Sequence, residues 1–315
     1  MNAQSFHDKT ILVVLTIVMA STSMLLAQPI VTEEALPTPL QSLIDADAYR
    51  GGGGRLHVVG LAETTYGFWD AYRLQFYTAR QQNGATSTIM LPDTGLFWFD
   101  GLHGEEDRFR RAVAVDANDN VFMCWSKRRV IRSDIPPFII MRQPRLQCVK
   151  LNASGMRLPL FDLTRATNPS IAVGPDNTAH FTWDNVWSVR RDSNYAGYNG
   201  TVFYRFATAG GALSNPVFVD SGFSSRVASH APNSAHIVWL KGDSATATRL
   251  ALKYGLVTSG VLSPIVTLRE QLYAPDSVVL SVDTSGIVHV GWMEKRPSNL
   301  LKLFHLRRIP PDTIV

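Results

Sequence analysis

The sequence of 315 residues lacks the short motifs that mark common catalytic and nucleotide-binding sites. It contains no Gly-x-Ser-x-Gly nucleophile elbow, no Walker phosphate loop and no paired cysteine motif. The glycine run at 51–54 is not followed by a helix, so it predicts a loose turn and not a phosphate cradle. Neither sign of charge predominates: 30 Lys and Arg residues stand against 26 Asp and Glu residues, and the net charge is only +4. This is a weak bias toward anionic partners, and we expect no nucleic-acid partner.

Cysteine is nearly absent, with Cys124 and Cys148 as the only two. They fall at the end of one expected strand and at the start of the next, on neighbouring antiparallel strands. Export would permit a disulfide between them, whereas cross-strand geometry is often poor for such a bond. Two interpretations therefore stay open, a bridge or two small buried thiols.

Long apolar runs are lacking after the first 27 residues. Lys9 precedes an apolar run from Ile11 to Met19, and small residues follow up to Ala27. This order predicts a secretory signal peptide over residues 1–27, and no cysteine follows it to carry a lipid anchor. We expect a mature chain that is extracellular, on the cell surface or periplasmic, with no membrane span.

The chain does contain a repeated stretch, clearest at residues 168–183, which read NPSIAVGPDNTAHFTW. The stretch predicts a short strand, a turn built from Gly, Pro, Asp and Asn, and a second strand that ends on Trp183. Its copies end at positions 60, 125, 183, 239 and 292, the first on glycine and the others on tryptophan. A repeat of this length indicates a propeller or a solenoid.

The remainder of each repeat predicts a third strand, a Gly-rich turn and a fourth strand that usually contains proline. Four antiparallel strands per repeat are typical of a propeller blade, and largely apolar faces suit a sheet that is covered on both sides. We therefore predict an all-β fold, a five-bladed β-propeller that forms a single domain over residues 28–315. The PIVT sequence at 29–32 matches an outer strand at 264–267. An N-terminal strand at 29–33 is therefore expected to pair with 301–306 and close the ring.

The hairpin SIAVGPDNTAHFTW, followed by FYRFATAGGALSNPVFV, resembles the repeats of sialidase-like (Asp-box type) propellers over essentially the whole mature chain. That family often carries turns of the form Ser-x-Asp-x-Gly-x-x-Trp. The corresponding turns at 152–155, 207–211 and 257–260 lack both the Asp and the Trp. Active sialidases also share an Arg-Ile-Pro motif near the start of the domain, whereas the only such string here is at 308–310. The resemblance implies the fold and leaves the catalytic residues unknown.

Connections of variable length are expected to gather on one rim of the propeller, where loops on a rigid scaffold tend to bind ligands. They cover residues 62–70, 92–110, 184–200 and 293–299. Tryptophans outside the repeat position lie there, beside charged groups of both signs, as in many binding sites. The candidate ligand-binding residues are Trp69, Trp98, Trp187, Arg190, Arg191 and Glu294.

These features favour a non-catalytic module, a monomer without cofactor, that binds an extracellular glycan or protein. The alternative is a glycoside hydrolase of sialidase-like type, which would need two carboxylates about 5–10 Å apart. A third hypothesis is a purely structural surface protein. The missing catalytic motifs favour the first hypothesis over the second, and the rim tryptophans favour it over the third.

Three further patterns have a structural and a functional interpretation. The histidines at one repeat position could ligate a metal, but we favour local partners, because equivalent positions lie far apart; they are His57, His180, His236 and His289. The Asx-rich stretch 116–120 is spaced like calcium ligands, but it lacks the glycine and closing Glu of such loops and predicts an ordinary turn. The basic stretch could grip an anionic polymer, but a solvated loop is favoured; it holds Arg128, Arg129, Arg132, Arg142 and Arg145. No metal is expected.

Overall fold

The computed structural model describes residues 42–50, 55–66, 70–80, 86–99, 104–132, 139–141, 144–152, 156–192, 195–242, 249–273, 275–295, 301–309 and 313–314. Within these ranges the chain forms strands and turns, which confirms the all-β prediction. These ranges hold no helix that could cross a membrane. The predicted signal peptide and the predicted N-terminal strand at 29–33 lie outside them.

The first sheet has nine antiparallel strands and contains the first two sequence repeats. Its strands are β1 (Ser42–Arg50), β2 (Leu56–Tyr66), β3 (Asp70–Arg80), β4 (Thr86–Phe99), β5 (Gly104–Val115), β6 (Val121–Arg132), β7 (Ile139–Met141), β8 (Arg145–Leu151) and β9 (Arg157–Thr164). The order along the sheet follows the chain. The short β7 pairs with the last residues of β6, at 130–132, and β8 pairs with the earlier part of β6, at 121–127.

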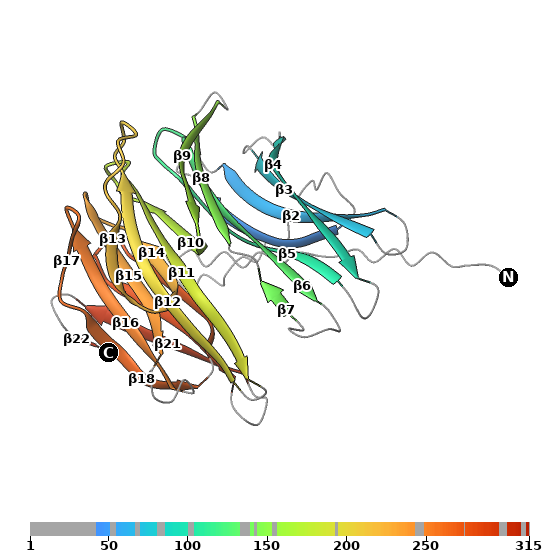
Figure 1. The fold of residues 1–315 in the computed structure, drawn as a ribbon. Coiled ribbons are helices and arrows are strands. Elements are labelled where there is room, and N and C mark those ends of the chain that lie inside the picture. The colour runs from blue at the N-terminus through green and yellow to red at the C-terminus, as the bar shows by residue number, and fades with distance from the viewer. Residues whose placement is uncertain are drawn as a thin grey trace, which may run out of the picture.

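Each of the last three repeats forms a sheet of its own. The third repeat holds β10 (Ala166–Val173), β11 (Ala179–Asp192), β12 (Tyr195–Ala207) and β13 (Val217–Ser221). The fourth holds β14 (Phe223–Ala228), β15 (Ser234–Gly242), β16 (Arg249–Thr258), β17 (Val261–Leu262) and β18 (Val266–Tyr273). The fifth holds β19 (Pro275–Val282), β20 (Val288–Lys295), β21 (Leu301–Ile309) and β22 (Thr313–Ile314). Figure 1 shows these three sheets stacked beside one another, with the first sheet to their right.

The predicted hairpin is present in every repeat, and its register is that expected from the alternation of residues. In the third repeat Val173 pairs with Ala179 and Ala172 with His180 across a turn at 174–178. Within this turn Asn177 has a φ of 61°, a conformation that Asn adopts more readily than most residues. The equivalent residues Asp119 and Asn233 also have positive φ, at 61° and 49°. Turn chemistry therefore fixes the same hairpin in several repeats.

The region 92–110, predicted as a long loop, is largely strand. β4 continues to Phe99, and β5 already begins at Gly104, so the two strands pair between Phe97 and Glu106. This pairing joins the first two repeats into one sheet where separate four-stranded blades were expected. The run Leu96–Phe99 explains the difference, because aromatic residues favour strands. Residues 184–192 likewise continue β11, and residues 195–200 belong to β12.

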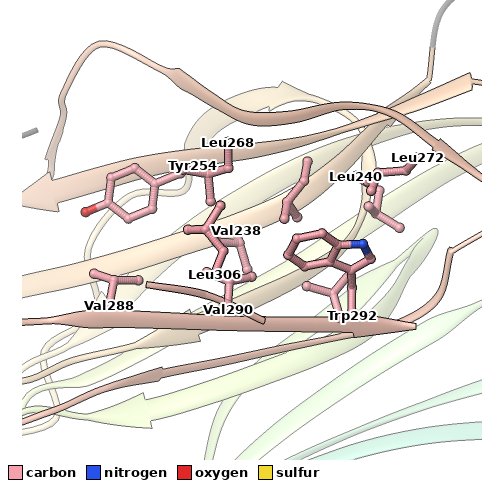
Figure 2. Packing of buried hydrophobic residues seen from close by; sticks show 11 residues of the cluster. Val238, Leu240, Tyr254, Leu268, Leu272, Val288, Val290, Trp292 and Leu306 are labelled. Atoms are coloured by element: carbon pink, nitrogen blue, oxygen red, sulfur yellow. The ribbon is translucent and has the colours of Figure 1, made fainter. Parts of the chain in front are cut away.

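Four apolar clusters fill the space between successive repeats, and the repeat tryptophan of each second strand from β6 onward packs in one of them. The second strands were predicted to end on these tryptophans, but each continues beyond its tryptophan. Trp125 packs with residues of the first repeat, Trp183 with the second, Trp239 with the third and Trp292 with the fourth. All four are almost fully buried. Figure 2 shows the cluster of the fourth and fifth repeats, with Trp292 beside Leu240 and Leu272. The second, third and fourth repeats are therefore covered on both faces, as the apolar strands predicted.

The predicted closure of the ring stays a prediction, as does the number of five blades. β22 pairs with β21 only at Arg308 and Ile309. Residues 301–307 of β21 have no partner among the described strands on that edge, and Leu303 is 78% exposed there. This is the edge at which the sequence predicts the N-terminal strand.

Candidate functional site

The turns between first and second strands lie at 116–120, 174–178, 229–233 and 283–287, and neighbouring turns contact each other: the backbone N–H of Ala117 donates to Asn177, and that of Asn233 donates to Asp176. We call the side with these turns the turn face, and the opposite side, toward which the second strands run, the loop face. Figure 1 shows the long β11–β12 hairpin reaching the lower edge of the sheets. The predicted ligand site lies on the loop face.

The structure distributes the predicted ligand-binding residues over three sheets. Trp69 lies outside the described residues. Trp98 belongs to β4, where its backbone pairs with Asp70 and Glu105. Trp187 stands at a register shift in β11 between Val186 and Ser188. The predicted rim is thus built from extended strands as well as connections.

Arg190 and Arg191 follow Trp187 in the same strand, paired with Gly197 and Ala196 of β12. These positions belong to a two-stranded extension of the third sheet, beyond the part of β12 that pairs with β13. The two arginines therefore belong to a strand pair, where a loop was predicted.

Glu294 occupies an enclosed position near the end of β20. It is 7% exposed, and its Oε1 accepts a hydrogen bond from Nε1 of Trp292 at 3.0 Å. A buried indole N–H needs an acceptor, so Glu294 completes the packing of the repeat tryptophan. This partner lies two residues away in the same strand, on the same strand face.

The side chain of Asp184 links the third repeat to the fourth, a structural role that the sequence did not predict. It directly follows Trp183 and is completely buried. Its Oδ2 accepts from Asn168 Nδ2 at 2.8 Å and from the Ser224 backbone N–H at 2.6 Å. Its Oδ1 accepts from Ser225 Oγ at 2.7 Å and from the Ser225 backbone N–H at 3.3 Å. Four donors from two repeats converge on this carboxylate.

Burial raises the pKa of Asp184, and the hydrogen bonds from Asn168, Ser225 and Ser224 act in the opposite direction. Two backbone bulges aim these donors. Asn168 and Ser224 hold equivalent positions in β10 and β14, with φ of 50° and 55°, and the strand register shifts at both. Positive φ is uncommon for serine and indicates a conformation held by its surroundings. The bulges therefore shape the loop-face end of both first strands.

Asp220 forms a second contact between the same two repeats. Nζ of Lys241 donates to both of its carboxylate oxygens, at 2.8 and 2.9 Å. Trp239 Nε1 donates to Oδ2 at 3.3 Å. Asp220 is the next-to-last residue of β13, the fourth strand of its repeat, while the two donors belong to β15 of the next repeat. It thus satisfies one buried indole, as Glu294 does for another.

Three carboxylates near the ends of second and fourth strands are therefore engaged by donors within the chain. Glycoside hydrolysis needs a pair of carboxyl groups that face a substrate. Asp184, Asp220 and Glu294 instead satisfy serine, asparagine, lysine and tryptophan donors. Asp184 and Asp220 join the third repeat to the fourth, and Glu294 binds a tryptophan of its own strand.

The repeated histidines have local partners, as predicted. In three repeats Nδ1 of the histidine lies within hydrogen-bonding distance of a tyrosine hydroxyl on the third strand. The pairs are His57–Tyr77 at 2.8 Å, His180–Tyr204 at 2.7 Å and His236–Tyr254 at 2.8 Å. Burial lowers the pKa of His180 to about 4, so the ring is neutral at pH 7.

The second repeat replaces this histidine–tyrosine contact. Phe122 stands at the histidine position and Cys148 at the tyrosine position, as the strand register shows. Cys148 lies directly opposite Cys124, with 4.1 Å between their Cα atoms, and a disulfide joins them. The covalent bond therefore links the second and third strands where a hydrogen bond links them in other repeats.

The Asx-rich turn at 116–120 satisfies itself, as an ordinary hairpin turn does. Oδ1 of Asp116 accepts from the backbone N–H groups of Asn118 and Asn120, and Oδ2 accepts from the Asn120 side chain. The basic stretch was predicted to be a solvated loop, but part of it is a strand. Arg128, Arg129 and Arg132 lie in β6. Arg145 binds Asp162. Arg142 lies outside the described residues.

No protein-family model matches the sequence, and no curated protein matches it either. Solved structures share its fold. A mutant of the NanB sialidase from Streptococcus pneumoniae aligns with a TM-score of 0.52 at 8% identity, and the alignment covers 88% of this chain and 60% of the sialidase. The same sialidase in complex with 2-[(3-chlorobenzyl)ammonio]ethanesulfonate gives 0.51 at 9% identity, with 88% and 60% covered.

A thermostable family-43 glycoside hydrolase aligns with a TM-score of 0.45 at 10% identity, covering 88% of this chain and 94% of its own. The chain spans about 60% of the length of the sialidase chains that it matches. The likeness to the sialidase shows the fold. The chain has a β-propeller fold like that of this sialidase, and the similarity at the level of sequence is low.

Proposed function

We propose that this protein is a secreted β-propeller that binds an extracellular glycan through its loop face without hydrolysing it. The observation that carries the proposal is the fold shared with a sialidase, an enzyme that acts on glycans. Fold alone does not assign an activity, so the choice between binding and catalysis depends on the residues of the loop face.

The engaged carboxylates favour binding over hydrolysis. Asp184 accepts four hydrogen bonds, Asp220 binds a lysine and an indole, and Glu294 binds an indole. A general acid or nucleophile must reach the glycosidic bond, whereas these groups already bind donors within the chain. Trp69, Trp98 and Trp187 would supply apolar platforms for sugar rings, and Arg190 and Arg191 would pair with an anionic sugar.

Binding of the purified protein to a glycan array tests the proposal, with Trp69→Ala, Trp98→Ala and Trp187→Ala made singly. Loss of a binding platform should weaken affinity about fivefold or more, since hot-spot aromatics contribute about 1 kcal/mol or more. Phe218→Ala is the matched control, because Phe218 is an exposed aromatic residue of an outer strand and not part of the predicted rim. The proposal is wrong if no glycan binds, or if the control weakens binding as much as the three variants do.

The alternative function is glycoside hydrolysis of sialidase-like type, which the same fold likeness favours. Release of a fluorescent leaving group from a panel of aryl sialosides and other aryl glycosides would detect it. Turnover of any of these substrates by the purified protein would establish the alternative and contradict a purely binding role.

A further inference from the structure

We propose that His289 and His305 form a two-histidine chelate for a divalent transition-metal ion on the fifth repeat, with Zn²⁺ as the probe. Nδ1 of His289 in β20 lies 3.2 Å from Nε2 of His305 in β21. The two rings are nearly parallel, at 13°. Among the described residues no group of three or more His, Cys, Asp or Glu side chains could hold a metal ion. The chelate therefore has two protein ligands, and water completes the coordination.

The separation of the nitrogens suits a shared metal ion. Zinc binds imidazole nitrogen at about 2.0–2.1 Å with tetrahedral angles, which places two ligand nitrogens about 3.3 Å apart. His305 is exposed, so its ring can turn to direct the nitrogen lone pair at the ion. His289 is held more firmly, with 16% of its side chain exposed. One fixed ligand and one adjustable ligand are thus adjacent on neighbouring strands.

Asp283 lies beside the ring nitrogen of His289 that does not face His305. Oδ2 of Asp283 lies 3.6 Å from Nε2 of His289. Oδ1 of Asp283 accepts from the backbone N–H groups of Ser285 and Ile287, which leaves Oδ2 for His289. A carboxylate beside Nε2 favours the tautomer with the proton on that nitrogen, and this tautomer directs the Nδ1 lone pair at His305. Metal-binding histidines commonly have such a carboxylate behind them.

The other repeats lack this arrangement at the same positions. Their third-strand partner is Tyr77, Tyr204 or Tyr254, whose neutral hydroxyl is a poor zinc ligand and can donate to the histidine as well as accept. The turn of the second repeat begins with Asp116, but the Asn120 side chain donates a hydrogen bond to Oδ2 of Asp116. In the fifth repeat Ile287 stands at the position of Asn120 and has no side-chain donor, so Oδ2 of Asp283 faces His289.

Isothermal titration of the untagged protein with Zn²⁺ tests the chelate, and His305→Tyr is the informative variant. Tyrosine is the residue of three other repeats at this position, so the fold should be retained while one ligand is lost. We expect one Zn²⁺ per chain, bound at least tenfold more weakly by His305→Tyr. Asp283→Asn should weaken binding about tenfold or more, because loss of a supporting carboxylate has this effect at histidine metal sites.

The histidine pair of the fourth repeat supplies the matched control. His236 Nε2 lies 3.0 Å from His230 Nδ1, but Tyr254 stands behind His236 where Asp283 stands behind His289. His230→Asn should therefore leave Zn²⁺ affinity unchanged. Absence of Zn²⁺ binding, equal binding by His305→Tyr and the unaltered protein, or loss of binding in His230→Asn alone would each overturn the proposal.

Discussion

Replacement of Asp184 by alanine should be among the most destabilising changes at the loop face. The substitution removes the acceptor of four hydrogen bonds in a completely buried position. The hydroxyl of Ser225 and the amide of Asn168 can turn toward other acceptors. The backbone N–H groups of Ser224 and Ser225 are fixed by the bulge in β14 and cannot.

The magnitude follows from these two backbone donors. An unsatisfied buried donor costs about 1–3 kcal/mol, so the two fixed donors together cost about 2–6 kcal/mol. We therefore expect Asp184→Ala to lower the free energy of unfolding by about 4 kcal/mol. Native domains have about 5–15 kcal/mol in total, so the variant would be marginal.

Asp184→Asn separates two states of the carboxyl group. Burial raises its pKa, while four donors favour the ionised form. If the carboxyl group is ionised, the asparagine amide places its own N–H₂ donor against one of these donors, and the free energy of unfolding should fall by about 1–3 kcal/mol. If the carboxyl group is protonated, the amide should replace it with little loss of stability.

Urea unfolding followed by tryptophan fluorescence measures these differences, because the repeat tryptophans are buried. Asp162→Asn is the control. It removes an exposed carboxylate bound by Arg145 and Gln147, and exposed pairs contribute about 1 kcal/mol or less. A loss in Asp184→Ala no larger than that in Asp162→Asn would refute the reasoning.

Three further predictions follow from the ends of the chain, the disulfide and the buried histidine. Deleting residues 28–34 should lower the melting temperature by about 4–8 °C, as expected for two or three strand hydrogen bonds lost from β21; an unchanged melting curve contradicts ring closure. Thiol titration of the denatured, unreduced protein should find no free thiol, and reduction should cost about 3 kcal/mol of stability for a bridge that spans 24 residues; two free thiols would exclude it. His180 has a folded pKa of about 4 against 6.5 unfolded, so its contribution is complete above pH 6.5 and is lost as pH falls toward 4, by about 3 kcal/mol. His180→Phe, which introduces the residue that the second repeat has at this position, should remove this slope in urea unfolding measured from pH 7.5 to 4.5; a slope that persists assigns it to other groups.

Local patterns in the sequence were sufficient to predict the elements that repeat. The alternation around Trp183 places this residue, Phe181 and Ala179 on one face, and all three pack in the cluster shared with the second repeat. The turn residues predicted the hairpins, because positive φ at Asn177 and its equivalents needs residues of this type. These predictions succeeded because their causes lie within a few residues of one another.

The strand extensions and the contacts between repeats could not be predicted in this way. Aromatic and β-branched residues on either side of a rim connection extend the strands, so the length of a gap did not reveal a loop. The role of Asp184 depends on Asn168, 16 residues away, and on Ser225, 41 residues away. Nothing near Asp184 marks these partners. The same carboxylate suits a ligand site or a structural contact, and only the approach of the next repeat distinguishes them.

Comparison between copies offers a stronger signal than any single copy. The position two residues before the cross-strand partner of the repeat histidine carries Tyr77, Tyr204 and Tyr254 in three repeats. Cys148 at this position of the second repeat is therefore a neighbour of Cys124 by the register alone, and His305 is a neighbour of His289 in the fifth. Because successive repeats share backbone geometry, a residue that departs from the common pattern inherits a known set of neighbours. One such departure produces a disulfide, and the other produces the histidine pair proposed here as a metal site.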